Sequence, residues 1–258
     1  MHKYVFISDW QYQRYQLVHG VPYDNKSIVL ESGIEPASKS CLEKNYDKIR
    51  LCYTSTPQRG LEILVPVFSK LTEKYGDRIH LDVFSSFKIY GWDEMDKQYQ
   101  PLYDEINNHP CMTYRGFVAN EELKSYLNSA HIHAYPSIWP ETSCRAMLEA
   151  MSAGLVCVHP NYGALPETSG GLNMMYHGDY ANRNLHALEF MNCLDAAIEM
   201  VDNRNHLNSI QFNKEFVDGR YNINRIKGKW ESMLKALIEK YPTIESRKQQ
   251  KAMFRYTT

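Results

Sequence analysis

The stretch HIHAYPSIWPETSCRAMLEAMSAGLVCVH, residues 131–159, predicts one strand–helix–strand unit. Its first six residues are typical of a strand, and a helical pattern at 142–153 follows a proline-containing loop. The run LVCVH, at 155–159, predicts the next strand. Two strands that are joined by a helix in this way indicate a parallel βαβ unit, which is the building block of α/β folds.

The same alternation of strand and helix patterns extends along most of the chain. Further strands are predicted at 4–8, 26–30, 49–54, 79–85 and 112–115, and further helices at 9–20, 60–76, 93–107, 120–129, 184–202, 206–218 and 223–240. We therefore predict an α/β fold with a Rossmann-like, doubly wound parallel sheet. Loops after five of the strands carry Gly, Ser, Thr, Pro or aromatic residues, although loops are rich in these residues anyway. Because ligands of such sheets bind beyond the carboxyl ends of the strands, we expect a ligand site along that edge.

The composition narrows the class of protein. A chain of 258 residues, 43% of them hydrophobic and 23% charged, is long and apolar enough for one large domain, or for one domain with a fragment of another. A net charge of -1 does not steer the molecule towards nucleic acid. The cysteines form no CxxC pair, so free thiols in a reducing cytosol are the simplest interpretation. No signal peptide or membrane-spanning run is evident, so we expect a cytoplasmic protein.

Two glutamates, Glu141 and Glu149, lie eight positions apart around the predicted helix. On a helix this spacing corresponds to about 12 Å along the axis, whereas the paired carboxylates of glycoside hydrolases lie ~5–10 Å apart. The spacing suits a ligand with two polar ends, and free N–H groups of Thr142, Ser143 and Cys144 would suit a phosphate between them. The alternative is that Glu141 complements the helix dipole and that Glu149 is a solvated side chain.

The loop STPQRG, residues 55–60, joins a predicted strand to a predicted helix. Arg59 offers a forked set of donors that suits a diphosphate, and Gly60 would let the backbone approach it closely. The alternative is a surface arginine at the start of a helix, where its charge opposes the helix dipole. The GxxxxGK[ST] pattern of a Walker loop is absent.

Two other loops are candidates for ligand contact. Residues 116–118 include Phe117 and Val118, which would present an apolar wall to a base, and the alternative is a loop that caps the core. Residues 161–167 predict a turn followed by a helix, in which Gly163 either allows close approach to a sugar or only forms the turn.

Two features, a pair of histidines and the basic tail, have simpler explanations than a functional site. His131 and His133 share one face of a strand, but no third ligand is spaced to join them, so we expect ordinary packing and no metal site. The tail at 246–258 is basic and contains two aromatic residues. We interpret it as a frayed end, with contact to an anionic membrane or to a partner as the alternative.

Four segments, YTSTPQRGLEIL, GFVANEEL, AHIHAYPSIWPETSCRAMLEAMSAGLVCV and PNYGALPE, together suggest a family. They resemble the donor-binding half of retaining GT-B glycosyltransferases of the glycosyl transferases group 1 family. The resemblance covers roughly residues 27–205. PSxxxE, the two glutamates separated by seven residues, EAMSAG, the VCV strand and NxGxxPE occur in the family's order and spacing.

The resemblance implies a role for most of the candidate residues. Glu141 would contact hydroxyl groups of the transferred sugar and help to position the reacting centre. Glu149 would hold the ribose of the nucleotide, and Arg59 would bind the diphosphate. Residues 116–118 would meet the base.

The resemblance also places the amides around Ser143 and Cys144 next to the sugar phosphate. Many members have a Gly-Arg pair ahead of a Lys-Gly pair in the first loop, and this chain has STPQRG instead. One of two basic contacts to the diphosphate is therefore missing at that position.

A GT-B enzyme has two Rossmann-like domains with the active site between them. The resemblance implies that residues 1–36 are a remnant of the N-terminal domain, that 37–205 form the nucleotide-sugar domain, and that 206–258 are closing helices and the basic tail. It further implies hexosyl transfer with retention of configuration from a nucleoside-diphosphate sugar, without a metal or another cofactor. The acceptor, a glycan, lipid or protein, is open. The chain is either a truncated product, a fragment, or a subunit whose acceptor domain a partner chain would supply.

Three alternatives to an active glycosyltransferase stay open. The chain is either a donor-binding module that is inactive without the missing domain, an inactive structural protein that kept the fold, or, more remotely, a nucleotide-sugar epimerase.

Overall fold

Within the residues that the computed structural model describes, 3–22, 24–37 and 43–240, six parallel strands form one sheet in the order β5–β4–β3–β6–β7–β8. Their bounds are Ile49–Thr54 (β3), Ile79–Phe84 (β4), Met112–Tyr114 (β5), Ile132–Ala134 (β6), Val156–Pro160 (β7) and Met174–Tyr176 (β8). The chain builds the sheet outward from β3 to β5 and then from β6 to β8, so its direction reverses between β3 and β6. Ligands of doubly wound sheets bind at that reversal. The α/β fold predicted from the sequence is confirmed.

Helices cover both faces of this sheet. One face carries α2 (Leu61–Tyr75), α3 (Gln100–Asn108) and α7 (Arg183–Asp202), and the other carries α4 (Asn120–Ser129), α5 (Arg145–Ser152) and α8 (Leu207–Arg220). In α2 the buried residues Leu61, Leu64, Val65 and Phe68 recur at the 3- and 4-residue spacing that gives a helix one apolar side. The short helix α6 (Leu165–Ser169) lies between β7 and β8.

The centre of the core is the pair of strands β3 and β4. Leu51 pairs with Leu81 and Ile49 with Ile79, and all four side chains have no exposed surface. Each such side chain contributes roughly 1.5–3 kcal/mol by leaving water. The loops at the carboxyl ends of these strands therefore start from a rigid base.

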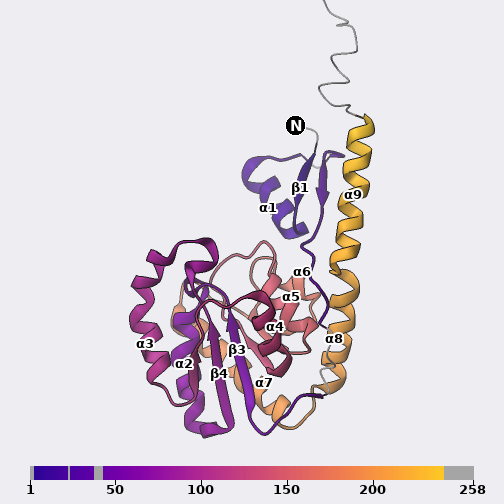
Figure 1. The fold of residues 1–258 in the computed structure, drawn as a ribbon. Coiled ribbons are helices and arrows are strands. Elements are labelled where there is room, and N and C mark those ends of the chain that lie inside the picture. The colour runs from indigo at the N-terminus through magenta and orange to yellow at the C-terminus, as the bar shows by residue number, and fades with distance from the viewer. Residues whose placement is uncertain (1–2, 23, 38–42, 241–258) are drawn as a thin grey trace, which may run out of the picture.

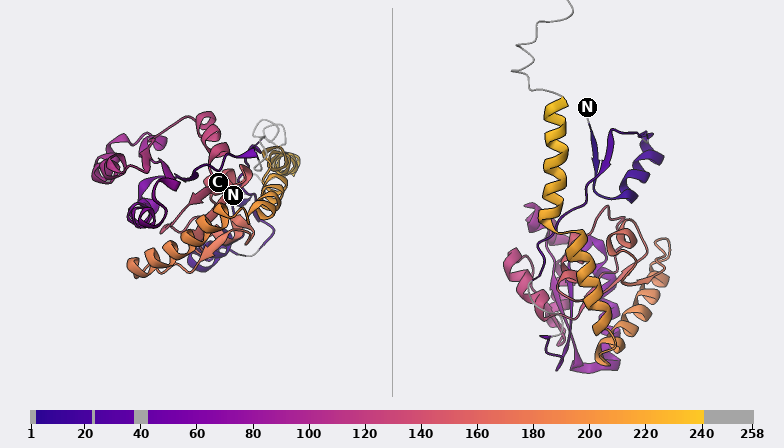
Figure 2. Two further views of the ribbon diagram at one scale, coloured as in Figure 1. Left: turned by 90° about the horizontal axis from the view of Figure 1, so that it is seen from below. Right: turned by 90° about the vertical axis from the view of Figure 1, so that its right-hand side faces the viewer.

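The first residues form a separate small element, which we call the N-terminal unit (residues 3–34). It contains β1 (Tyr4–Phe6), α1 (Asp9–His19) and β2 (Ser27–Val29), and β1 and β2 pair in parallel. Figures 1 and 2 show the unit beside the upper half of α9 (Ile223–Lys240), the last described helix. Ile34 joins the two, because its N–H donates to the Tyr221 carbonyl at 2.8 Å and its carbonyl accepts from the Ile223 N–H at 2.8 Å.

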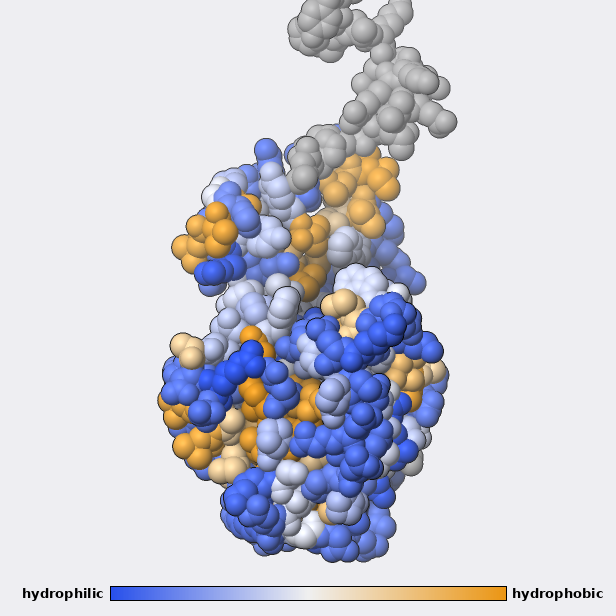
Figure 3. Space-filling model, turned by 90° about the vertical axis from the view of Figure 1, so that its left-hand side faces the viewer, coloured by the Kyte–Doolittle hydropathy of each residue, from blue (hydrophilic) through white to orange (hydrophobic). Residues whose placement is uncertain are grey.

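Apolar side chains remain exposed on the N-terminal unit and on α9. Leu17 is 81% exposed on α1, and Trp230, Leu234 and Ile238 follow one another at four-residue intervals along α9 with 36%, 47% and 62% exposure. Figure 3 shows apolar colour gathered on this upper part of the molecule. None of the helices in the described part of the chain is both long enough and apolar enough to cross a bilayer.

Several predicted boundaries differ from the structure. The helix predicted at 142–153 begins only at Arg145, because the preceding residues are held in an irregular loop. The edge strand β8 was not predicted, since MMY is short and glycines lie near it on both sides. The helix predicted at 93–107 is a 3₁₀ segment, Asp93–Tyr99, followed by α3. The three-part domain division stays a prediction, and the basic tail lies outside the described residues.

Candidate functional site

A cleft of about 740 Å³ lies at the carboxyl ends of the central strands. The loops after β3, β4, β5 and β6 line it, and Ile7 and Ser32 of the N-terminal unit close it from the other side. The candidate residues that line it are Arg59, Phe117, Val118, Glu141, Thr142, Ser143, Cys144 and Glu149. Gly60 and Gly163 are not among the lining residues.

Glu141 and Arg59, which come from the two sides of the sheet reversal, form an ion pair. Arg59 Nη1 donates to Glu141 Oε1 at 2.6 Å, and the Tyr135 hydroxyl donates to the same oxygen at 2.6 Å. The Glu141 side chain is 5% exposed and that of Arg59 is 23% exposed. The sequence predicted both residues at the site but not their contact, and it did not single out Tyr135.

Burial determines how these groups ionise. Loss of water raises the pKa of the Glu141 carboxyl above its usual value, and Arg59 and Tyr135 only partly oppose this effect. The pKa of Arg59 is raised by the neighbouring Glu141 carboxylate against the opposing effect of burial, so the guanidinium stays charged. Arg59 Nε is buried without a hydrogen-bond partner among the described residues. The Arg59 side chain, which is 23% exposed, nevertheless brings its charge to the wall of the cleft.

A second Arg–Glu pair lies at the other end of the same segment. Arg145, the first residue of α5, donates from Nη2 to Glu149 Oε1 at 3.1 Å, one helical turn further along. This pair is open to solvent, with side chains 59% and 26% exposed. Arg145 also lines the cleft, and the sequence prediction missed it. Its signal was a cation at the start of a helix, where it opposes the helix dipole.

The start of α5 presents backbone N–H groups to the cleft. Leu148 is the first residue whose N–H donates within the helix, to the Cys144 carbonyl at 3.1 Å. Among the described residues, the N–H groups of positions 142–146 have no hydrogen-bond partner, and all five positions line the cleft. This arrangement suits an anion. The candidate residues Thr142, Ser143 and Cys144 precede the helix instead of forming its first turn.

Two glycines, Gly60 and Gly163, let other loops of the site pack closely against them. Gly163 has φ +60°, and a Cβ there would lie 2.7 Å from the backbone nitrogen and oxygen of Glu141. A Cβ on Gly60, at φ +114°, would overlap the carbonyl oxygen of Pro136. In each case the space that glycine leaves is filled by another loop of the protein. The close approach predicted for these two positions is thus between loops.

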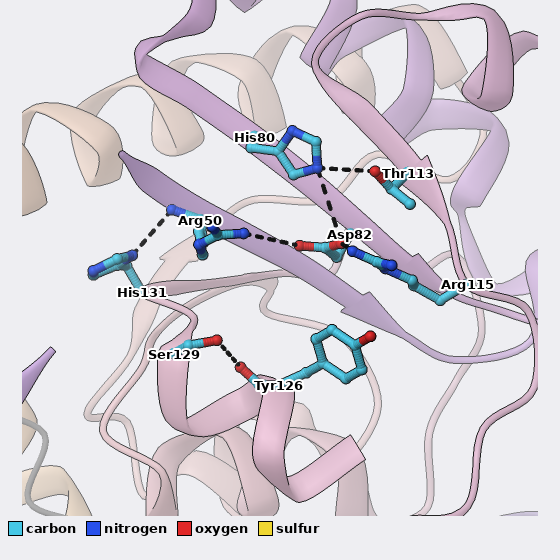
Figure 4. Close-up of polar contacts among 8 residues, drawn as sticks. All are labelled: Arg50, His80, Asp82, Thr113, Arg115, Tyr126, Ser129 and His131. Carbon is cyan, nitrogen blue, oxygen red and sulfur yellow. Dashed lines mark hydrogen bonds and ion pairs between the residues drawn. The ribbon is translucent and has the colours of Figure 1, made fainter. Parts of the chain in front are cut away.

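The loop that carries Phe117 is held by a buried charge. Arg115 donates from Nε to Asp82 Oδ1 at 2.9 Å, and its backbone N–H donates to the Val83 carbonyl at 2.8 Å. Figure 4 shows Asp82 among Arg115, Arg50 and His80, on strands next to the helix that carries Tyr126 and Ser129. The guanidinium of Arg115 also lies 5.0 Å from the Tyr126 ring. Directly after this anchor, Phe117 stands 48% exposed at the cleft.

His131, which directly precedes β6, and His133 within β6 are both buried and packed as expected. His131 Nδ1 accepts from the Arg50 N–H at 3.0 Å, and His133 Nε2 lies 3.1 Å from the Thr54 hydroxyl. Burial lowers the pKa of each to about 3, so both rings are neutral.

The sequence is similar to sequences of known glycosyltransferases. The family model described as glycosyl transferases group 1 matches residues 49–188, which is more than half of the chain. The amylovoran biosynthesis glycosyltransferase AmsK of Erwinia amylovora is 27% identical over 172 residues. That match covers 61% of this chain and 39% of AmsK.

Solved glycosyltransferases share the fold. A glycosyltransferase of Rickettsia africae ESF-5 superposes with a TM-score of 0.73 at 16% identity, covering 92% of this chain and 63% of its own. Anabaena Alr3699/HepE, solved in complex with UDP and glucose, gives 0.67 at 15% identity, with 92% and 64% covered. The fold is that of GT-B glycosyltransferases, and the chain spans less than two thirds of the length of these relatives.

Proposed function

This chain belongs to the glycosyl transferases group 1 family, and on that premise we propose that it binds a nucleoside-diphosphate sugar in the cleft and transfers the sugar to an acceptor. The observation that carries the proposal is the convergence of Arg59, Glu141, Glu149 and Phe117 on one cleft at the sheet reversal. These residues lie up to 90 positions apart in the sequence, and the loops after β3, β5 and β6 together with helix α5 bring them together.

The lining of the cleft supports one orientation of the donor. The exposed ring of Phe117 offers a surface for the base, and the Glu149 carboxylate accepts from ribose hydroxyls. The open amides before α5 face the diphosphate, and Glu141 accepts from hydroxyls of the sugar. In this orientation Glu141 is the residue nearest the reacting carbon, and it is the catalytic residue of the proposal.

Transfer requires stabilisation of the departing diphosphate. The charged Arg59 guanidinium lines the cleft, and the amides of positions 142–146 have no hydrogen-bond partner among the described residues. Donors that are already aimed at a developing charge stabilise it without reorganisation. We propose that these groups take the role that a metal ion has in other transferases, and that the anomeric configuration of the hexose is retained.

A donor-binding module is the second candidate. A GT-B active site lies between two domains, and here, within the described residues, the N-terminal unit supplies only Ile7 and Ser32 to the cleft. The exposed apolar residues of α1 and α9 favour contact with a further domain or partner chain. Under this alternative the donor binds and no transfer follows until that domain is present. The expected location is the cytoplasm, with peripheral membrane contact if the acceptor is a lipid.

A panel of UDP-, GDP- and ADP-sugars tests the proposal. We expect one nucleotide series to raise the melting temperature of the full chain, because a ligand that binds only the folded state stabilises it. Hydrolysis or transfer of the same donor, measured by release of the nucleoside diphosphate, separates the enzyme from the binding module. If all three series leave the melting temperature unchanged, the donor site is refuted.

A further inference from the structure

We propose that Arg145 is the second cation of the diphosphate site and takes the place of the basic residue that the first loop lacks. This inference rests on the proposed donor site. Arg59 and Arg145 are the two cationic side chains among the described residues that line the cleft. Each is paired in the free protein with one of the two glutamates, Arg59 with Glu141 and Arg145 with Glu149.

The two pairs differ in how readily they open. The Arg59–Glu141 pair is buried at 2.6 Å and is reinforced by Tyr135, so separating it would leave a buried charge alone. The Arg145–Glu149 pair is exposed at 3.1 Å, and exposed ion pairs contribute little to stability. Arg145 is therefore the cation that can turn to a ligand at small cost.

When the Arg145–Glu149 pair opens, a bound nucleoside diphosphate offers each of the two side chains a new hydrogen-bond partner. Its phosphate oxygens accept from the Arg145 guanidinium, and its ribose hydroxyls donate to Glu149. A nucleoside without phosphates offers a partner only to Glu149, because it has ribose hydroxyls and no phosphate oxygens. The position of Arg145 also fits, since it begins α5 directly beside the unpaired amides of 142–146. A cation at this end of a helix is unfavourable by itself, and an anion bound there removes that cost.

A comparison of variants by titration calorimetry tests the assignment. The ligands are the nucleoside diphosphate that stabilises the wild type, among UDP, GDP and ADP, and the matching nucleoside. We expect Arg145→Gln to weaken the diphosphate about tenfold, because hydrogen bonds to charged groups contribute that much or more. Nucleoside affinity should stay within about twofold. Arg145→Lys, which keeps the charge, should recover part of the loss.

Arg183 provides a matched control. It is the first residue of α7, its side chain is 61% exposed, and it pairs with Glu62 across the surface. Arg183→Gln thus removes an arginine from the same kind of position away from the cleft, and we expect unchanged affinity. Equal diphosphate affinity in wild type and Arg145→Gln would overturn the inference and leave the donor site intact. An equal loss for nucleoside and diphosphate would also overturn it, while a wild type that binds none of the three diphosphates would remove the donor site itself.

Discussion

Replacement of Arg59 by methionine tests the buried ion pair that organises the cleft. The variant keeps the length of the side chain and removes its charge, which leaves Glu141 5% exposed without its cation. Breaking a buried pair costs about 3–5 kcal/mol. We expect the lower end, about 3 kcal/mol, because the Tyr135 hydroxyl still donates to Glu141 Oε1. For a chain of this size such a loss lowers the melting temperature by about 6–12 °C.

The pH dependence of that loss identifies its cause. Arg59 lowers the pKa of Glu141 against the larger raising effect of burial, so its removal raises that pKa further. A carboxyl whose pKa is higher in the folded state than in the unfolded state stabilises the fold at low pH, and this contribution is lost as the pH rises. The penalty for Arg59→Met should therefore be largest at pH 7.5 and smaller at pH 5.5.

Urea unfolding of four proteins at both pH values is the assay. The proteins are the wild type, Arg59→Met, the double variant Arg59→Met/Glu141→Gln, and Arg183→Met as the control for an exposed pair. The double variant should regain most of the lost stability, because no charge remains buried. The control should lose less than about 1 kcal/mol. A penalty that is equal at the two pH values and persists in the double variant would refute the reasoning.

Three further changes probe other parts of the site. Gly163→Ala should displace the Glu141 backbone and cost more, by at least about 1 kcal/mol in thermal unfolding, than Gly171→Ala, which has a similar φ of +72° but open space around it. Glu149→Ala should weaken the melting-temperature response to a nucleotide, while Glu141→Ala should reduce only the extra response to the nucleotide sugar, and equal responses in all three proteins would contradict the assignments. Glu167→Ala should speed hydrogen exchange in α1 and cost about 1 kcal/mol, because its carboxylate accepts from the first two N–H groups of that helix at 2.8 Å each.

The sequence predicted the parts of the fold that depend on local pattern. Strands β3 (IRLCYT) and β4 (IHLDVF) carry an apolar residue at least at every second position, and α2 carries its apolar residues on one side, so both kinds of element could be located before the structure. The start of α5 could not, because the backbone of Glu141 is held by Gly163 and Ala164 from a loop that comes more than twenty residues later. That contact keeps the segment before Arg145 irregular.

In the candidate site, too, some features could be predicted from the sequence and others could not. The spacing of Glu141 and Glu149 and the position of Arg59 after a strand are visible in the chain, and the structure brings all three to one cleft. The pairing of Arg59 with Glu141 spans 82 positions and depends on β3 lying next to β6. Local sequence patterns do not predict which strands are neighbours in the sheet. Arg145 was not predicted as a site residue, because its place at the start of α5 and its pairing with Glu149 depend on where that helix begins.

The N-terminal unit is connected by hydrogen bonds to the segment that carries Glu141. The Ala164 N–H donates to the Glu141 carbonyl at 2.7 Å, and three residues later Glu167 holds the start of α1. Ile7 and Ser32 meanwhile form one wall of the cleft. Any rotation that opens this wall therefore pulls on Glu167, and through α6 on the backbone of Glu141. Because that backbone is packed against Gly163 without spare space, the wall formed by the N-terminal unit and the position of Glu141 are linked through one continuous series of contacts.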